Sequence, residues 1–372
     1  MDGVLVEPRA YHLALQKTVS LVGKAVGFSD LELKPADIAA FEAAEVSSEW
    51  DTAAICAALT LIKAWSVDKH KKLAYSMREI PPQTLELAPP DFHTFAALLG
   101  RPEIKGMRPL ARAVRLLLEK ETSLTCAQQG ELINIFSKAR QINGSLTHRL
   151  FQEMILGSRV FDEVYGLSPQ LDCESFLLAY DRPALSEEEC NKLKDWSRDK
   201  GHRIVIFTSR PSRAPQGAAS TPEAEMGAQL VGLEQTPIAG LGGLLWLSQW
   251  LDADVETFLK PDPVHALLAL GLAMGREWNQ CLENAAAFSI EGGSKLFWER
   301  LEGAEVLVFE DTPGGLSSAS SAQKLLAEAG VRIKTRFFGI ATDERKDRAL
   351  KAHGAEVFST LSAALREAGV IS

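Results

Sequence analysis

The carboxyl-terminal half of the sequence alternates short apolar runs with segments of helical pattern, and this alternation restricts the folds open to the chain. Strand-like runs are expected at Arg203–Phe207, Glu256–Leu259, Glu305–Phe309, Thr335–Ala341 and Glu356–Phe358. Strands that alternate with helices build a parallel sheet with helices on its faces. The sequence therefore predicts an α/β fold with a Rossmann-like parallel sheet.

The part between about Tyr11 and Gly201 has a helical pattern instead. Apolar residues recur there at three- and four-residue spacing, as at Ile55, Leu59 and Ile62, which is the spacing of one helix face. A large helical domain is thus expected inside the α/β fold, inserted soon after the first residues. The predicted division is a helical cap over residues 12–195 and an α/β core over residues 1–11 and 196–372.

Charge and cysteine content exclude several classes of function. The formal net charge is −9 over 372 residues, so the chain lacks the positive surface that binds nucleic acid or an anionic membrane. Its cysteines are dispersed without CxxC spacing, which is typical of reduced thiols and not of a disulfide framework or zinc site. No basic stretch followed by an apolar run marks a signal peptide. We expect a cytoplasmic protein without nucleic-acid or membrane partners, and its oligomeric state stays open.

Chemically reactive groups stand at four places where strands are expected to end. These are Asp2-Gly3-Val4, Thr208-Ser209-Arg210, Lys260-Pro261-Asp262 and Glu310-Asp311. Each has an ordinary structural explanation by itself: a turn aspartate, a helix cap, a surface lysine, or acids at a helix start. Ligands of open α/β sheets bind at the carboxyl ends of the strands, so the four segments together predict one site.

In this order the four segments resemble the motifs of the haloacid dehalogenase superfamily, in the subfamily whose helical cap lies between motifs one and two. That family has DxDG[VT] as motif one, then a serine or threonine after a strand, then a lysine, then a pair of acids followed by glycine. Asp2-Gly3-Val4, Thr208, Lys260 and Glu310-Asp311 match these motifs. The stretch Phe309–Gly315 also resembles phosphoglycolate phosphatases and β-phosphoglucomutases.

The resemblance implies a magnesium-dependent phosphatase that acts on a small phosphorylated metabolite through an aspartyl-phosphate intermediate. Asp2 would be the acid and the base, Thr208 would bind phosphoryl oxygens, and Lys260 would neutralise their charge. Ser209 and Arg210 would contact the substrate, with Arg210 as a bidentate donor to an anion.

The resemblance also implies a magnesium site. Magnesium prefers oxygen ligands and keeps waters and substrate phosphate in its coordination shell. Asp311 would be a direct ligand, Glu310 a ligand or a water-mediated partner, and the backbone carbonyl of Asp2 a further ligand. The expected cofactor is therefore Mg²⁺.

The chain departs from the family in motif one. The family's nucleophile is the aspartate two residues before Asp2, and Met1 takes the position between them. The apolar strand that leads to this aspartate is central in the family's sheet, and losing it would leave buried backbone groups unpaired. We expect that the chain as written is inactive because it begins inside motif one. A rearranged, non-catalytic protein is the other interpretation.

Two alternatives to a phosphatase stay open. A phosphomutase would need cap groups that exclude water and hold a sugar in two orientations. A binding protein for a phosphorylated metabolite would have the site without turnover. Within the cap, Glu49-Trp50-Asp51 and His148-Arg149 are candidate substrate contacts, although acids at a helix start and solvent-exposed charges are ordinary features of helices.

Overall fold

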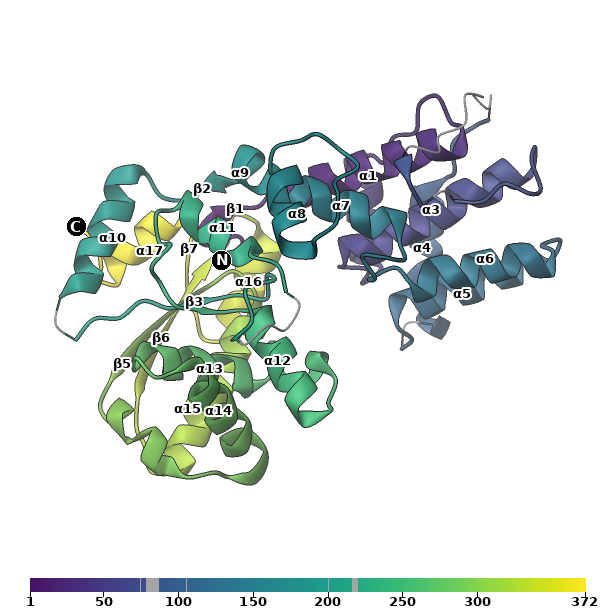
Figure 1. Cartoon of the computed structure of the whole chain (residues 1–372). Coiled ribbons are helices and arrows are strands. Elements are labelled where there is room, and N and C mark those ends of the chain that lie inside the picture. Colours follow the sequence, from purple (N-terminus) through teal and green to yellow (C-terminus); the bar gives the residue numbers. More distant parts are fainter. Residues whose placement is uncertain (74, 78–86, 105, 200, 216–219) are drawn as a thin grey trace. The chain divides into compact units, whose positions relative to one another are not determined.

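The computed structural model describes residues 1–372 except 74, 78–86, 105, 200 and 216–219. The chain divides into two compact units (Figure 1). Residues 1–8 and 181–372 form the first, which we call the α/β unit, and residues 9–180 form the second, the helical unit. No helix in the described parts of the chain is long and apolar enough to cross a membrane.

The helical unit is organised around its first helix, which packs against α3, α7 and α9. Alanine and leucine fill much of α3, where Ser48 caps the first turn by accepting a hydrogen bond from the Asp51 amide. The bounds of its helices are α1 (Ala10–Val26), α2 (Pro35–Ala43), α3 (Glu49–Trp65), α4 (Phe92–Leu99), α5 (Pro109–Lys120), α6 (Cys126–Ser137), α7 (Leu146–Leu156), α8 (Ser158–Tyr165) and α9 (Phe176–Tyr180), with a 3₁₀ turn η2 (Pro102–Ile104).

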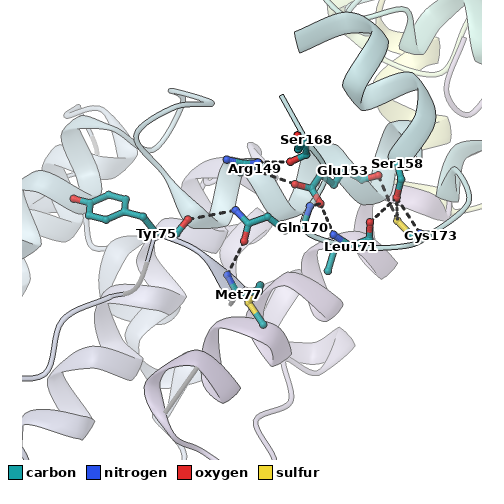
Figure 2. Close-up of polar contacts among 9 residues, drawn as sticks. All are labelled: Tyr75, Met77, Arg149, Glu153, Ser158, Ser168, Gln170, Leu171 and Cys173. Atoms are coloured by element: carbon teal, nitrogen blue, oxygen red, sulfur yellow. Dashed lines mark hydrogen bonds and ion pairs between the residues drawn. The ribbon is translucent and has the colours of Figure 1, made fainter. Parts of the chain in front are cut away.

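The buried carboxylate of Glu153, on α7, holds the segment that follows α8 (Figure 2). The Glu153 side chain has no exposed surface and forms an ion pair with Arg149 one turn earlier. Its other oxygen accepts hydrogen bonds from the amides of Gln170 and Leu171, at 2.8 and 2.9 Å. Three charge-assisted bonds compensate the desolvation of this carboxylate, so Glu153 has a structural role within the helical unit.

The α/β unit contains three small sheets among its described residues. β1 (Val6–Glu7) pairs with β2 (Arg182–Pro183) in antiparallel fashion. β3 (Ile206–Phe207) and β4 (Ile238–Ala239) form a parallel pair. β5 (Glu305–Glu310), β6 (Lys334–Ile340) and β7 (Glu356–Phe358) form a three-stranded parallel sheet in that order. The predicted α/β class is confirmed at this level.

Helices connect these strands and cover them. One hydrophobic core contains buried residues of β3, β4, α10, α11 and α17. A second core is formed mainly by α12, α13, α14 and α15. The bounds are α10 (Glu187–Arg198), α11 (Glu223–Leu230), α12 (Leu241–Leu251), α13 (Pro263–Ala273), α14 (Trp278–Glu291), α15 (Pro313–Glu328), α16 (Glu344–Ala352) and α17 (Leu361–Glu367), with 3₁₀ turns η4 (Val255–Thr257), η5 (Lys295–Phe297) and η6 (Glu299–Leu301).

Of the five predicted runs, four contain a strand and one does not; the run predicted at Arg203–Phe207 is a strand only over β3, Ile206–Phe207. The runs predicted around 305–309, 335–341 and 356–358 are strands β5, β6 and β7. Glu256–Leu259 was predicted as a strand, but its first two residues belong to the 3₁₀ turn η4. The Asp254 side chain accepts a hydrogen bond from the Glu256 amide, and the Asp254 carbonyl accepts one from Thr257. This local capping satisfies the backbone without a neighbouring strand.

The observed division of the chain also differs from the predicted one. The predicted helical domain ends at residue 195, whereas the helical unit ends at Tyr180. Residues 181–195 contain β2 and most of α10. Cys190 and Leu193 of α10 are buried in the core of the α/β unit, beside Ile206 and Val231. An amphipathic helix buries its apolar stripe against whichever core is adjacent, so its pattern did not reveal the unit to which α10 belongs.

Candidate active site

The polar residues predicted at the strand ends gather where β3 and β5 terminate. Lys260, in the loop before α13, connects these two ends. Its ammonium group donates to the Phe207 carbonyl at 3.3 Å and forms an ion pair with Glu310. It also lies 3.7 Å from the centre of the Phe207 ring, within the range of a cation–π interaction. Three of the predicted segments therefore meet around one partly buried cation.

Glu310 is held in place by its surroundings on β5 and α15. Its carboxylate pairs with Lys260 and accepts bonds from the Asp311 amide and the Thr312 hydroxyl, both at 3.3 Å. The backbone of Gly315 lies so close that a Cβ atom there would overlap the Glu310 carboxylate. The glycine after the acidic pair is thus required for this packing.

Asp311 lies against the turn that begins the chain. A Cβ atom on Gly3 would overlap the Asp311 carboxylate, and Gly3 has a φ of +65°. Both facts favour glycine, because it has no side chain and adopts positive φ at little cost. Asp311 also forms an ion pair with Lys346 of α16. The sequence analysis did not identify Lys346, because a lysine in the first turn of a helix has no distinguishing pattern.

Asp2 is bound by a buried arginine. The Arg210 guanidinium donates to both carboxylate oxygens of Asp2, with Nε at 2.8 and 2.9 Å, and to Asp181 at 2.8 Å. The side chains of Arg210 and Asp181 are 2% and 0% exposed, whereas that of Asp2 is 36% exposed. Arg210 was predicted to contact substrate, but the structure places it inside the unit between two carboxylates. Asp181 was missed, because one aspartate in a loop carries no distinguishing pattern.

Thr208 and Ser209 follow β3. Thr208 is buried, its amide donates to the Ala239 carbonyl, and its hydroxyl accepts a bond from the Arg210 amide at 3.1 Å. Ser209 is exposed. Buried His265 of α13 contacts the Ala239 carbonyl at 3.0 Å and lies against the Phe207 ring in a T-shaped arrangement. Burial, with Lys260 nearby, lowers the pKa of His265 to about 3, so this imidazole is neutral and supports the β3 end.

The amino group of Met1 lies among the same charges. Burial is the main cause that lowers its pKa, and Lys260 lowers it further, while Glu310, Asp2 and Asp311 act in the opposite direction. All of these groups are therefore close enough to interact. The structure brings Asp2, Thr208, Lys260, Glu310 and Asp311 together, as the sequence analysis predicted.

The donor groups can be tested for their fit to a hard cation. Within the described residues, no three His, Cys, Asp or Glu side chains are arranged to hold a metal ion. The carboxylates of Glu310 and Asp311 are of the type that Mg²⁺ prefers, but Lys260 and Lys346 neutralise them. Their chemistry fits magnesium, on the condition that Lys346 gives up its contact with Asp311.

The cap residues that the sequence singled out form contacts within the helical unit. Asp51 is buried and forms a two-bond ion pair with Arg140, at 3.1 and 3.0 Å. The Trp50 ring lies 4.8 Å from the His148 ring. Burial lowers the pKa of His148 to about 4, and Arg149 pairs with Glu153. These contacts match the structural explanation of the cluster.

Comparison with known proteins relates the chain to others through its fold. No protein-family model matches the sequence, and no curated protein matches it. A crystal structure solved as Northeast Structural Genomics Consortium target ZR25 superimposes with a TM-score of 0.66 at 14% sequence identity. The match covers 99% of this chain and 97% of the other. The chain thus shares its fold with this protein over the full length of both.

Proposed function

We propose that the α/β unit contains a phosphatase site of the haloacid dehalogenase type. At this site a small phosphorylated metabolite would be hydrolysed with the help of Mg²⁺. The observation that carries the proposal is the meeting of four separate segments at the ends of β3 and β5. Lys260 joins the Phe207 carbonyl to Glu310, and Gly3 packs on Asp311. Phosphoryl transfer depends mainly on positioning and on charge neutralisation, and this cluster is suited to both.

The roles of the individual groups follow from their chemistry. Lys260 neutralises phosphoryl oxygens, and the Thr208 hydroxyl, which accepts from the Arg210 amide, has its own proton left to donate to them. Glu310, Asp311 and the Asp2 carbonyl would hold Mg²⁺, whose charge would offset that of the phosphate. Arg210 takes a positioning role instead of the predicted substrate contact, because it holds Asp2 by two bonds.

The attacking carboxylate must be supplied in addition to these residues. Asp2 is bound to Arg210, Glu310 to Lys260, and Asp311 to Lys346. In the proposed reaction a further carboxylate attacks phosphorus, the bond to the leaving oxygen breaks, and Asp2 protonates that oxygen. Asp2 then takes a proton from water, which attacks the acyl phosphate and releases inorganic phosphate.

The helical unit is proposed to act as a cap. One of its two connections is Tyr180–Asp181, and Asp181 is bound to Arg210, which also holds Asp2. The connection is therefore anchored to the site itself.

The test measures p-nitrophenyl phosphate hydrolysis by the full chain and by a chain in which an apolar strand ending in aspartate is joined to Met1. That aspartate would stand two residues before Asp2. We expect magnesium-dependent turnover by the extended chain, abolished by EDTA and reduced by Lys260→Ala. Lys295→Ala, at an exposed position, is the control. Absence of turnover in an extended chain that is folded would contradict the proposal.

A second function is favoured by the pairing of every acid at the site with a cation. A site whose acids are already paired with cations suits a protein that binds a phosphorylated metabolite without turnover. Titration with inorganic phosphate separates the two functions, because binding that depends on Lys260, without hydrolysis by any extended chain, identifies a binding protein.

A further inference from the structure

The two acids where β5 ends are each paired with a lysine, and the two lysines are held in different ways. The Lys260 side chain is 12% exposed, and its ammonium group contacts the Phe207 carbonyl, the Phe207 ring and Glu310. The Lys346 side chain is 34% exposed, and within the described part of the chain its ammonium group has a polar contact with Asp311 alone. Lys260 is therefore fixed by several contacts, whereas Lys346 can exchange its one contact for water.

The backbone that carries Lys346 is held in place, so an exchange needs only its flexible side chain to move. Asp343 caps α16, and its carboxylate accepts a hydrogen bond from the Lys346 amide at 2.8 Å. One turn later, Leu350 is fully buried in one small core with Leu316 of α15. Because α15 begins two residues after Asp311, the cap and this core keep the first turn of α16 beside the acid.

One carboxylate oxygen of Asp311 is approached from two sides. Its Oδ2 atom accepts the bond from the Lys346 ammonium group, and a Cβ atom on Gly3 would overlap the same oxygen. A divalent cation that used this oxygen would lie within ion-pair distance of the ammonium group, where like charges repel strongly. Mg²⁺ also requires a near-octahedral shell of oxygen ligands, and an ammonium group is not a ligand. Lys346 and Mg²⁺ therefore compete for Asp311.

The acidic pair needs a second cation when no metal is bound. The side chains of Glu310 and Asp311 are 5% and 17% exposed, and two neighbouring carboxylates with so little water around them repel each other. Lys260 neutralises the first acid, and Lys346 neutralises the second. Of these two lysines, Lys346 is the one that can leave without losing other contacts.

We propose that Lys346 is an exchangeable counter-ion of Asp311. Its ammonium group neutralises the acid while the site holds no metal, and turns out to solvent when Mg²⁺ binds. The inference rests on the proposed magnesium site and adds to it the residue that sets metal affinity. Lys346 stabilises the metal-free protein, and by the same contact it weakens magnesium binding, because its ion pair with Asp311 must first be broken.

The experiment titrates magnesium chloride into the full chain and into its Lys346→Met variant by calorimetry. We expect the variant to bind Mg²⁺ about fivefold more tightly, since a partly exposed ion pair contributes a free energy of that order. Lys346→Arg keeps the positive charge and should bind much as the full chain does. Arg345→Met removes an exposed cation one residue earlier, and should leave the affinity unchanged.

Two further measurements follow Lys346 without any turnover. Acetylation of lysines by an N-hydroxysuccinimide ester, quantified by mass spectrometry, should be severalfold faster at Lys346 in saturating Mg²⁺ than in EDTA, because its nitrogen is then exposed to the reagent. Lys351 pairs with Asp347 in the same helix, and should react equally in both. In EDTA, Lys346→Met should melt below the full chain, and Mg²⁺ should raise its melting temperature by more.

The outcomes separate this inference from the proposed function. Equal magnesium affinity of the full chain and Lys346→Met, or acetylation of Lys346 that magnesium does not change, would overturn the exchange and leave the metal site standing. Absence of magnesium binding by both proteins would remove the metal from the proposed phosphatase, and Lys346 would then be a permanent partner of Asp311. The expected affinities and acetylation, without turnover by the chain extended with aspartate, would support the exchange and reject the phosphatase.

Discussion

Removal of the Arg210 side chain tests the most buried charges of the candidate site. Arg210→Met removes the Arg210 ion pair from fully buried Asp181 and also from Asp2, which is about one third exposed. Breaking a buried pair by removing one partner costs about 3–5 kcal/mol, since the remaining charge is desolvated without compensation. For a unit of this size each kcal/mol lowers the melting temperature by about 2–4 °C, so we expect a fall of roughly 10 °C.

The ion pairs of Arg210 with Asp2 and Asp181 also predict how variants rank in stability. Asp2→Asn leaves the buried Arg210–Asp181 pair intact, so its cost should stay near about 1 kcal/mol. Arg210→Met combined with Asp181→Leu replaces the buried pair by apolar groups, and we expect recovery of much of the loss. Arg203→Met changes an exposed arginine nearby and should shift stability by no more than about 0.5 kcal/mol.

The assay is urea unfolding, with hydrogen exchange at amides of the α/β unit to assign the loss to that unit. If Asp2→Asn costs as much as Arg210→Met, the buried Asp181 contact is not the source of the cost. If the double variant is no more stable than Arg210→Met, the desolvation reasoning is wrong.

Three further predictions follow from single residues. Gly315→Ala should lower stability by about 1–3 kcal/mol through overpacking. Gly314→Ala should be neutral or stabilising, because a Cβ atom there would be 3.9 Å from its nearest neighbour. Equal effects of the two variants in thermal unfolding would contradict this. Burial lowers the pKa of His148 from 6.5 to about 4, so the unfolded chain takes up the proton first and stability is lost as pH falls from about 6.5 to about 4. His148→Phe should reduce the fall of the urea midpoint across this window, leaving the share that comes from His265, and exposed His353→Gln should leave the fall unchanged. Asp311→Asn should weaken magnesium binding at least about tenfold in the chain extended with aspartate, as a ligand carboxylate is lost, and an unchanged calorimetric affinity would remove Asp311 from the metal site.

The sequence was most informative where one local pattern decides the structure. The runs that became β5, β6 and β7 are apolar and β-branched, and few structures other than a buried parallel strand satisfy them. Glu256–Leu259 has a similar short pattern, but the preceding Asp254 caps the turn η4, and a local hydrogen bond of this kind competes well with a single short strand.

Partners across the candidate site could not be predicted in the same way. The four motif segments were found because each stands after an expected strand and their order matches a family. Asp181, Lys346 and His265 come from a loop and two helices, and each has only its residue type as a signal. Whether Arg210 points outward to a substrate or inward to Asp181 depends on the packing of segments 29 residues apart, which periodicity does not describe.

The contacts of Asp2 and Gly3 link the stability of the α/β unit to the candidate site. Arg210 holds Asp2 from the β3 side, and Asp311 lies against Gly3 from the β5 side. Asp2 and Gly3, together with Lys260, therefore connect the ends of β3 and β5 at the site. In the proposed phosphatase, fixed contacts of this kind would place charges where a phosphoryl group needs them.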